Sequence, residues 1–307
     1  MAISIPQAPA KHTAPPPPEA PQRFPVQPLL HLDSLWIQVA GTLCNLKCTH
    51  CFVSSGPGDD HHALMPRTEV ARQVADGLAL GVKEIYFTGG EPFVHPDMIA
   101  ILEQTLGVAP ATVLTNGTLL PARRIAALRR LSDEARYSLE LRVSLDGPSA
   151  AEHDELRGAG SFARALEGLQ GLAAAGLLPI VTVTRHDEDD EERFRERYLG
   201  MLRAAGIARP RLKVLPLFRL GREVGLHRGY EATETLAGLP ADGFDPARLQ
   251  CGSGRAVTSR GVFVCPLLVD EPGARMGSRL TDALGGFTLR HGACYTCQVT
   301  GMTCGNG

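Results

Sequence analysis

Residues 84–131 read EIYFTGGEPFVHPDMIAILEQTLGVAPATVLTNGTLLPARRIAALRRL and contain two strand–helix units in succession. Short β-rich stretches at 84–87 and 111–114 each precede a stretch with the apolar spacing of a helix, at 98–106 and 121–131. Strands that alternate with helices form a parallel sheet with the helices outside it. This stretch therefore decides the fold class, which is α/β.

The same alternation extends in both directions along the chain. The sequence predicts further strands and helices, the strands at 35–39, 139–145, 179–183 and 212–215 and the helices at 66–80, 162–175 and 189–205. Six right-handed strand–helix units make three quarters of a (β/α)8 barrel. We therefore predict a partial (β/α)6 TIM-like barrel with its active-site residues at the carboxyl ends of the strands.

Three regions differ in composition. Residues 1–28 hold nine of the 23 prolines and are predicted to be a disordered tail. Residues 29–240 hold the barrel. Residues 241–307 are rich in glycine and cysteine and poor in core residues, so we expect a small appendage that needs a metal centre for order. It contains one predicted hairpin, with 255–258 paired to 262–264.

The composition excludes several classes of protein. Of the 307 residues, 44% are hydrophobic and 21% charged, and the net charge is −2, so nothing favours binding to nucleic acid or to a membrane. No run approaches the roughly 20 apolar residues of a membrane helix, and no secretory pattern begins the chain. We expect a cytoplasmic protein, in which eight clustered cysteines indicate metal or iron–sulfur sites rather than disulfides.

The first three cysteines follow the first predicted strand with the spacing C-x3-C-x2-C, at Cys44, Cys48 and Cys51. A [4Fe–4S] cluster bound by three thiolates keeps one iron open, as a catalytic metal centre requires. A zinc site would need a fourth ligand such as His50, which we interpret as a passive loop residue. The spacing therefore predicts a catalytic iron–sulfur cluster.

With this motif, residues 34–217 resemble the radical S-adenosylmethionine (SAM) enzymes. The resemblance implies that SAM binds the open iron and is cleaved by one electron to methionine and a 5′-deoxyadenosyl radical, which abstracts hydrogen from a substrate. It also implies an electron donor of the flavodoxin or ferredoxin type. Phe52 matches the aromatic residue that the family places near the adenine.

Further motifs at strand ends agree with this family. Residues 88–92, Thr-Gly-Gly-Glu-Pro, resemble the GGEP motif, and the resemblance implies that Glu91 pairs with the SAM ammonium group and Arg157 with its carboxylate. The complete set of residues that we expect at SAM or the substrate is Phe52, Gly89, Gly90, Glu91, Pro92, Asn116, Ser144, Asp146 and Arg157.

The five remaining cysteines resemble the ligands of the Twitch and SPASM appendages, which hold auxiliary [4Fe–4S] clusters. Five thiols are too few for two such clusters, so we expect one here and two in the whole chain, with one thiol spare. We assign the ligands to Cys265, Cys294, Cys297 and Cys304 and leave Cys251 spare; the family pattern would use Cys251 and leave Cys304 spare. The spacing between Gly261 and Cys265 is one residue shorter than the usual pattern.

A spare thiol suggests a function. Radical SAM epimerases return a hydrogen atom from a cysteine to the inverted carbon, and the chain resembles the neomycin-type aminoglycoside epimerases. We therefore predict an isomerase of antibiotic biosynthesis that acts on a small molecule such as an aminoglycoside, with Cys251, or alternatively Cys304, as the hydrogen donor. A dehydrogenase that oxidises an alcohol and a peptide-modifying enzyme remain alternatives, although no leader-binding region is obvious for the latter.

Overall fold

The computed structural model describes residues 23–185, 190–239, 243–301 and 304–305. Its centre is a nine-stranded sheet with the order β10-β9-β8-β2-β3-β4-β5-β6-β7. Six strands form the parallel half of this sheet: β2 (Ser34–Gln38), β3 (Glu84–Thr88), β4 (Ala111–Thr115), β5 (Leu139–Ser144), β6 (Ile180–Arg185) and β7 (Arg211–Pro216).

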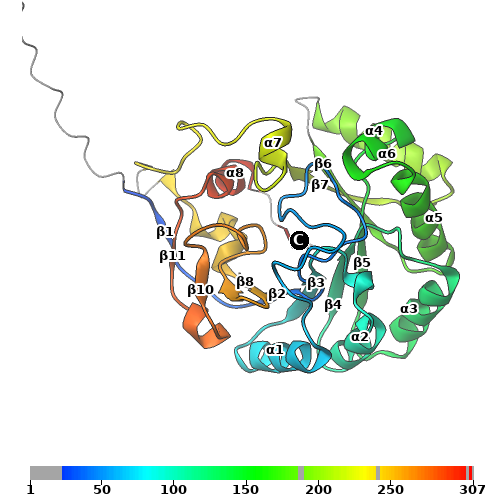
Figure 1. Cartoon of the computed structure of the whole chain (residues 1–307), viewed down its shortest axis with the longest axis horizontal. Helices are drawn as coiled ribbons and strands as arrows, with labels where there is room; N and C mark the ends of the chain where they lie inside the picture. The colour runs from blue at the N-terminus through cyan, green and yellow to red at the C-terminus, as the bar shows by residue number, and fades with distance from the viewer. Residues whose placement is uncertain (1–22, 186–189, 240–242, 302–303, 306–307) are drawn as a thin grey trace, which may run out of the picture.

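Helices surround these strands as the sequence predicts (Figure 1). They are α1 (Arg67–Ala79), α2 (Met98–Leu106), α3 (Ala122–Glu134), α4 (Ala150–Arg157), α5 (Ser161–Ala174) and α6 (Glu191–Ala204). The predicted partial (β/α)6 barrel is therefore confirmed. The short helix α4 was not predicted; Ser149 caps it, because its hydroxyl accepts a hydrogen bond from the Glu152 N–H at 3.3 Å.

Along the strands, side chains alternate between the core beneath the outer helices and the barrel interior. In β2, Leu35 and Ile37 pack against the outer helices, whereas Trp36 belongs to a second apolar cluster on the opposite side. Tyr86 of β3 belongs to this second cluster too, and its ring stacks on that of Trp36 with the centroids 4.1 Å apart. Because successive side chains of a strand face opposite ways, every second side chain points into the barrel interior.

The predicted C-terminal hairpin does not stand apart from the barrel. Its first strand, β8 (Gly254–Thr258), pairs in parallel with β2, and β9 (Gly261–Phe263) and β10 (Arg275–Gly277) extend the same sheet. Gly254 lies opposite Ser34, and a Cβ atom there would overlap the Ser34 hydroxyl. The barrel and the C-terminal region therefore share one sheet; the predicted boundary after residue 240 lies outside the described residues.

The predicted disordered tail is too long. Its last part forms β1 (Val26–Gln27), which pairs antiparallel with β11 (Phe287–Thr288). Gln27 is buried, and its side-chain amide donates to the Pro246 carbonyl at 3.1 Å. These two residues lie between prolines but keep their own N–H groups, so they can form a ladder that proline cannot. Residues 1–22 lie outside the described part of the chain.

Two more helices complete the described chain, α7 (Glu223–Leu226) and α8 (Gly292–Thr300). No helix among the described residues is long and apolar enough to cross a membrane.

The buried guanidinium of Arg255 generates a prediction about the C-terminal region. Arg255 is 1% exposed and donates to four carbonyl oxygens, those of Cys251, Gly254, Ala283 and Gly285, at 2.7–3.0 Å. Arg255→Met removes all of these donors and should lower the free energy of unfolding by about 3 kcal/mol, measured by urea titration. Arg260→Met, at an exposed neighbouring site, should change it by less than about 0.5 kcal/mol; equal effects of the two substitutions would contradict this role.

Candidate active site

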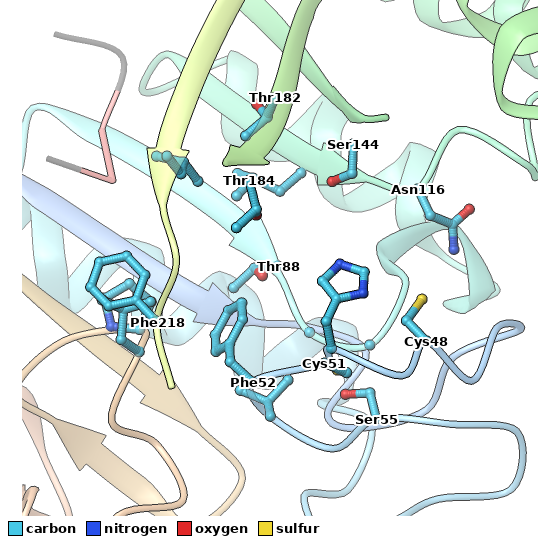
Figure 2. A pocket seen from close by; sticks show the side chains of 18 of the residues that line it. Cys48, Cys51, Phe52, Ser55, Thr88, Asn116, Ser144, Thr182, Thr184 and Phe218 are labelled. Atoms are coloured by element: carbon cyan, nitrogen blue, oxygen red, sulfur yellow. The ribbon is translucent and has the colours of Figure 1, made fainter. Parts of the chain in front are cut away.

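A cavity lies at the carboxyl ends of the parallel strands, where the barrel meets the C-terminal region. Figure 2 shows Thr184, Ser144 and Asn116 on one side of it and the loop that carries Cys48 and Cys51 on the other. The predicted site residues that line it are Cys44, Cys48, Cys51, Phe52, Gly89, Gly90, Asn116, Ser144, Asp146 and Arg157. The structure therefore brings most of the predicted set to one place.

The loop with the three cysteines lies directly against the end of β3. The Gly90 N–H donates to the Gly41 carbonyl at 2.8 Å, and the Glu91 N–H donates to the Leu43 carbonyl at 3.0 Å. A Cβ atom at Gly90 would overlap the Leu43 carbonyl oxygen, so only glycine allows this close approach. The Gly-Gly pair thus positions Cys44 by contact between backbones.

The far end of the same loop is held by Arg222, which sequence reasoning missed. Its guanidinium donates to the Cys48 carbonyl at 2.8 Å and to the Ser55 carbonyl at 2.6 Å. Its backbone N–H donates to the Cys51 carbonyl at 3.0 Å. No local motif marks Arg222, because it follows β7 and reaches the loop only through the closure of the barrel.

The three thiols fit an iron–sulfur cluster. Burial raises the pKa of Cys44 to about 12, and burial also raises the pKa of Cys48 despite the opposing charge of Arg157. A metal-free Cys44 thiol stays protonated at neutral pH, so a cationic group is needed to ionise it. Among the described residues, no three cysteine sulfurs lie within 4.8 Å of one another, the spacing at which ligand atoms could share a single ion. The donors therefore suit a larger group better than one zinc ion.

A buried ion pair adjoins this loop. Arg157 donates to Asp146 Oδ2 from Nε at 2.8 Å and from Nη2 at 2.6 Å, and His50 Nε2 lies 2.9 Å from the same oxygen. The Thr184 N–H donates to Asp146 Oδ1 at 2.8 Å. Burial alone would raise the pKa of Asp146, but the Arg157 guanidinium and the His50 ring outweigh it and hold that pKa well below its usual range. His50 is therefore not a passive loop residue: it ties the cysteine loop to the end of β5.

Arg157 keeps the position expected of a SAM carboxylate ligand. It lines the cavity, and its pairing with Asp146 uses Nε and Nη2. In the described part of the chain, this pairing leaves Nη1 available to meet a ligand carboxylate. The role of Arg157 in binding SAM stays a prediction.

Glu91 lies beneath the cavity rather than in its wall. The side chain is fully buried, and its carboxylate accepts from the Phe93 N–H at 3.0 Å, the Thr115 hydroxyl at 2.7 Å and the Asn116 N–H at 2.7 Å. Burial raises the pKa of Glu91, and these three donors offset part of that rise. Glu91 thus links the ends of β3 and β4, and its predicted pairing with SAM stays a prediction. Pro92, also predicted, is likewise buried outside the cavity wall.

Asn116 also fixes the cysteine loop. Its side-chain amide donates to Asn45 Oδ1 at 2.9 Å, and Asn45 in turn donates to the Thr118 hydroxyl at 2.8 Å. Phe52 lies at the rim with 37% of its surface exposed, which leaves its ring accessible to a flat ligand group.

Several cavity residues carry no motif and were missed. Polar ones among them that lie on strands are Gln38, Arg142, Thr182 and Thr184. Their signal was present in the strands: a polar residue between two apolar ones near the carboxyl end of a parallel strand faces the barrel interior. Thr182 between Val181 and Val183 shows this pattern, since both valines are buried in the outer core.

The remaining five cysteines surround a second, smaller cavity. Cys251, Cys265, Cys294, Cys297 and Cys304 line it together with apolar side chains such as Leu249, Leu268 and Phe287. Burial raises the pKa of all five thiols, to about 12 for Cys251 and Cys294, and the charges of neighbouring thiolates raise the pKa of Cys297 further. The donor set therefore fits an auxiliary cluster, and the choice of four ligands stays a prediction.

Cys304 and Cys251 differ in position. Cys304 lines both cavities, whereas Cys251 lines only the second. Arg142 of β5 donates to the Cys304 carbonyl, and the Cys304 N–H donates to Gln250 Oε1 at 2.7 Å. Of the five C-terminal cysteines, Cys304 is therefore the one that also lines the barrel cavity.

The comparisons with known proteins agree with this geometry. The model of the Radical SAM superfamily matches residues 39–196, which is more than half of the chain. Among curated proteins, the mycofactocin maturase MftC of Mycobacterium ulcerans is 31% identical over 271 residues, covering 80% of this chain and 70% of its own length. The GTP 3′,8-cyclase of Pelotomaculum thermopropionicum is 33% identical over 159 residues, covering 48% of this chain and 46% of the cyclase.

Among solved structures, Streptococcus suis SuiB bound to its precursor peptide SuiA aligns with a TM-score of 0.62. The alignment covers 83% of this chain and 65% of SuiB at 16% identity. At that identity the likeness shows a shared fold. The chain spans about half of the cyclase and less than two thirds of SuiB.

The buried ion pair leads to a first prediction for this site. Asp146→Asn keeps the side-chain shape but leaves the Arg157 charge without its partner, at a position where Asp146 is 2% and Arg157 14% exposed. Removing one partner of a buried pair costs about 3 kcal/mol, measurable by urea titration. As a control, Asp133→Asn on exposed α3, where Asp133 pairs with Arg129, should cost less than about 1 kcal/mol. Equal losses would show that the buried pair contributes no more than a surface pair.

A second prediction concerns pH and His153. This ring is fully buried, neither of its nitrogens has a hydrogen-bond partner among the described residues, and burial together with the Arg157 charge lowers its pKa from 6.5 to about 4. Between these values the unfolded chain binds the proton and the folded chain does not, so stability should fall as the pH is lowered from 6.5 towards 4. His153→Leu should reduce this slope by up to about 1.4 kcal/mol per pH unit, measured by urea titrations across the range.

Phe162→Leu provides the control, because Phe162 packs edge-on against His153 with centroids 5.7 Å apart but does not titrate. It should shift stability by the same amount at every pH. If the slope is unchanged in His153→Leu, the imidazole is protonated equally in both states.

Proposed function

Since this chain belongs to the radical SAM superfamily, we propose that it is a peptide-modifying enzyme that abstracts hydrogen from a residue of its substrate. In this proposal Cys44, Cys48 and Cys51 hold the catalytic [4Fe–4S] cluster, and the C-terminal cysteines hold one auxiliary cluster. A flavodoxin- or ferredoxin-type protein supplies the electron. When bound, the catalytic cluster and SAM together supply the carbon radical that removes the hydrogen atom.

The observation that carries the proposal is the charge of the cavity. Asp146 is the one acidic side chain among the described residues that line it, and its carboxylate is already engaged by Arg157 and His50. An aminoglycoside is a polycation that needs carboxylates around its ammonium groups. The cavity offers none that is free, so this substrate class, which we first predicted, is disfavoured.

The cavity wall instead suits a side chain of a peptide. Opposite the polar strand ends, it is built from Leu217, Phe218, Leu267 and Val269. Apolar walls with a few fixed polar groups are typical of sites that bury an apolar group and orient its polar neighbours. The named relatives support this class: the maturase acts in mycofactocin maturation, and SuiB binds the peptide SuiA.

The protein residues then have defined tasks. The Gly89–Gly90 backbone and Arg222 hold the cysteine loop in place. Arg157 orients the SAM carboxylate, and Phe52 at the rim covers the adenine. Leu217 and Phe218 exclude water from the side of the cavity where the substrate enters.

Epimerisation with a thiol as hydrogen donor is the second candidate, favoured by one observation. Cys304 lines the cavity beside the predicted SAM residues. In this candidate the S–H bond of Cys304, and not of Cys251, breaks as its hydrogen atom passes to the substrate radical, and the remaining thiyl radical is reduced by one electron from the electron donor and one proton from solvent. Solvent deuterium in the product of wild type, lost in Cys304→Ala, would identify this reaction.

The cluster assignment makes a direct prediction. Replacing Cys44, Cys48 and Cys51 by alanine should abolish the formation of 5′-deoxyadenosine by reduced, reconstituted protein, because no thiolate then holds iron beside the SAM residues. The triple variant should still contain iron at the auxiliary site, whereas Cys251→Ala serves as the matched cysteine control and should still cleave SAM. Production of 5′-deoxyadenosine by the triple variant would contradict the assignment.

The substrate class is tested by isotope transfer in the same assay. A peptide pool from cells grown in deuterated medium is compared with a deuterated aminoglycoside. We expect deuterium in 5′-deoxyadenosine only with the peptides. Transfer only from the aminoglycoside would replace the peptide proposal by the epimerase.

A further inference from the structure

Two adjacent histidines and an aspartate meet at a place that the proposed reaction does not use. His62 Nε2 lies 2.6 Å from Asp270 Oδ1, and His61 Nε2 lies 3.2 Å from the same oxygen. The ligand atoms of the three residues lie within 4.8 Å of one another. Among the described residues, no other such group of three histidine, cysteine or acidic side chains occurs.

His61 is oriented from behind by a second carboxylate. Its Nδ1 lies 2.7 Å from Asp59 Oδ1, and the Thr42 hydroxyl donates to that oxygen at 3.3 Å. A carboxylate on one ring nitrogen fixes the tautomer that leaves a lone pair on the other. The pair Asp59–His61 thus has the arrangement in which histidine binds metals, with Nε2 directed toward Asp270.

His62 is fixed by its backbone. Its N–H donates to the Thr42 hydroxyl at 3.2 Å, and its carbonyl accepts from the Thr42 N–H at 3.0 Å. Its ring is fully buried, packs edge-on against Phe263 with centroids 6.2 Å apart, and lies beside the His61 ring. The Nε2 position is therefore set before any ion binds.

The cluster joins two regions of the molecule. His61 and His62 lie in the loop between β2 and α1, whereas Asp270 belongs to the C-terminal region. The preceding residue, Val269, lines the barrel cavity. Close by, the Ala63 N–H donates to the Ser259 hydroxyl at 2.8 Å, so the same two regions also meet at a second point.

We propose that His61, His62 and Asp270 bind one divalent transition-metal ion, with Zn²⁺ as the best fit. Two imidazoles and one carboxylate are a frequent protein ligand set for zinc, with the fourth position left to water. Calcium and magnesium are poor candidates, because they prefer oxygen ligands. His61 and Asp270 are partly exposed, with 37% and 28% of their side-chain surfaces accessible, so an ion can enter from solvent.

The ion has a structural task in this proposal. It replaces the direct contacts of Asp270 with the two rings by metal bonds, and it fastens the segment after Cys265 to the barrel. That segment carries Leu267 and Val269 of the cavity wall. Binding of the metal therefore stabilises the wall against which the substrate lies.

The test uses the reconstituted holoenzyme, whose cysteines are occupied by iron and sulfide. After chelator treatment and desalting under anaerobic conditions, it is titrated with Zn²⁺, and bound zinc and iron are counted by elemental analysis. We expect one zinc ion per chain with unchanged iron, and a thermal midpoint that rises with zinc concentration. Zinc absorption spectroscopy should show nitrogen and oxygen neighbours at about 2.0–2.2 Å and no sulfur at about 2.3 Å.

Three variants locate the ion. His61→Ala and Asp270→Asn should remove the zinc uptake and the thermal shift, and Asp59→Asn should weaken zinc binding by about 10-fold or more. His31→Ala is the matched control, because His31 is also an exposed histidine beside an aspartate, Asp33. It should bind zinc as wild type does.

Each contrary outcome overturns the proposal. If the titrated wild type takes up no zinc, the two histidines and Asp270 form only ion pairs. If sulfur neighbours appear, zinc occupies the cysteines. If His61→Ala and Asp270→Asn bind zinc like wild type, the ion lies elsewhere.

Discussion

The buried carboxylate of Asp146 is the interaction on which the arrangement of the site depends. A carboxylate removed from water is unfavourable unless charged and polar partners surround it. Here they come from three separate elements: His50 from the cysteine loop, Thr184 from β6 and Arg157 from α4. The Asp146 carboxylate has all of these partners only when the cysteine loop, β6 and α4 come together at the end of β5. The same requirement places Cys48 and Cys51, on either side of His50, at the mouth of the barrel.

Local patterns predicted the barrel well, and long-range pairings explain what they missed. Strands such as β3 and β4 are short stretches rich in β-branched, aromatic and apolar residues and bounded by turn residues, which a single sequence reveals. In contrast, β1 and β11 have two residues each, and each strand forms its ladder by pairing with the other across the chain. The parallel pairing of β8 with β2 is of the same kind. Neither the pattern of β8 nor that of β2 specifies that these two strands lie side by side.

The candidate site shows the same difference between local patterns and long-range contacts. Cysteine spacing and short strand-end motifs identified many of the residues that line the cavity, because their chemistry is encoded within a few residues. The residues that hold these in place were missed or misjudged, since each acts across the fold. Arg222 reaches the cysteine loop from beyond β7, and His50 finds Asp146 only when the barrel has formed. Glu91 shows the converse: its motif was found, yet in the structure its carboxylate joins two strand ends.

The wall between the two cavities relates the auxiliary cysteines to the reaction. Leu267 and Cys304 line both cavities, so a single layer of side chains separates the auxiliary thiols from the space beside the SAM residues. A reaction that oxidises its substrate must pass an electron to an acceptor. An auxiliary cluster at the C-terminal cysteines would be well placed to receive it, because only this layer of side chains would separate the two. An epimerisation leaves the oxidation state of the substrate unchanged. In that reaction Cys304 would give a hydrogen atom to the substrate radical, and the resulting thiyl radical would take up one electron from the electron donor and one proton from solvent. Both proposed chemistries use this wall, and our proposal chooses between their substrates by charge. With Asp146 committed to Arg157 and His50, the described residues of the cavity offer no free carboxylate for an aminoglycoside, whereas the apolar wall suits a peptide side chain.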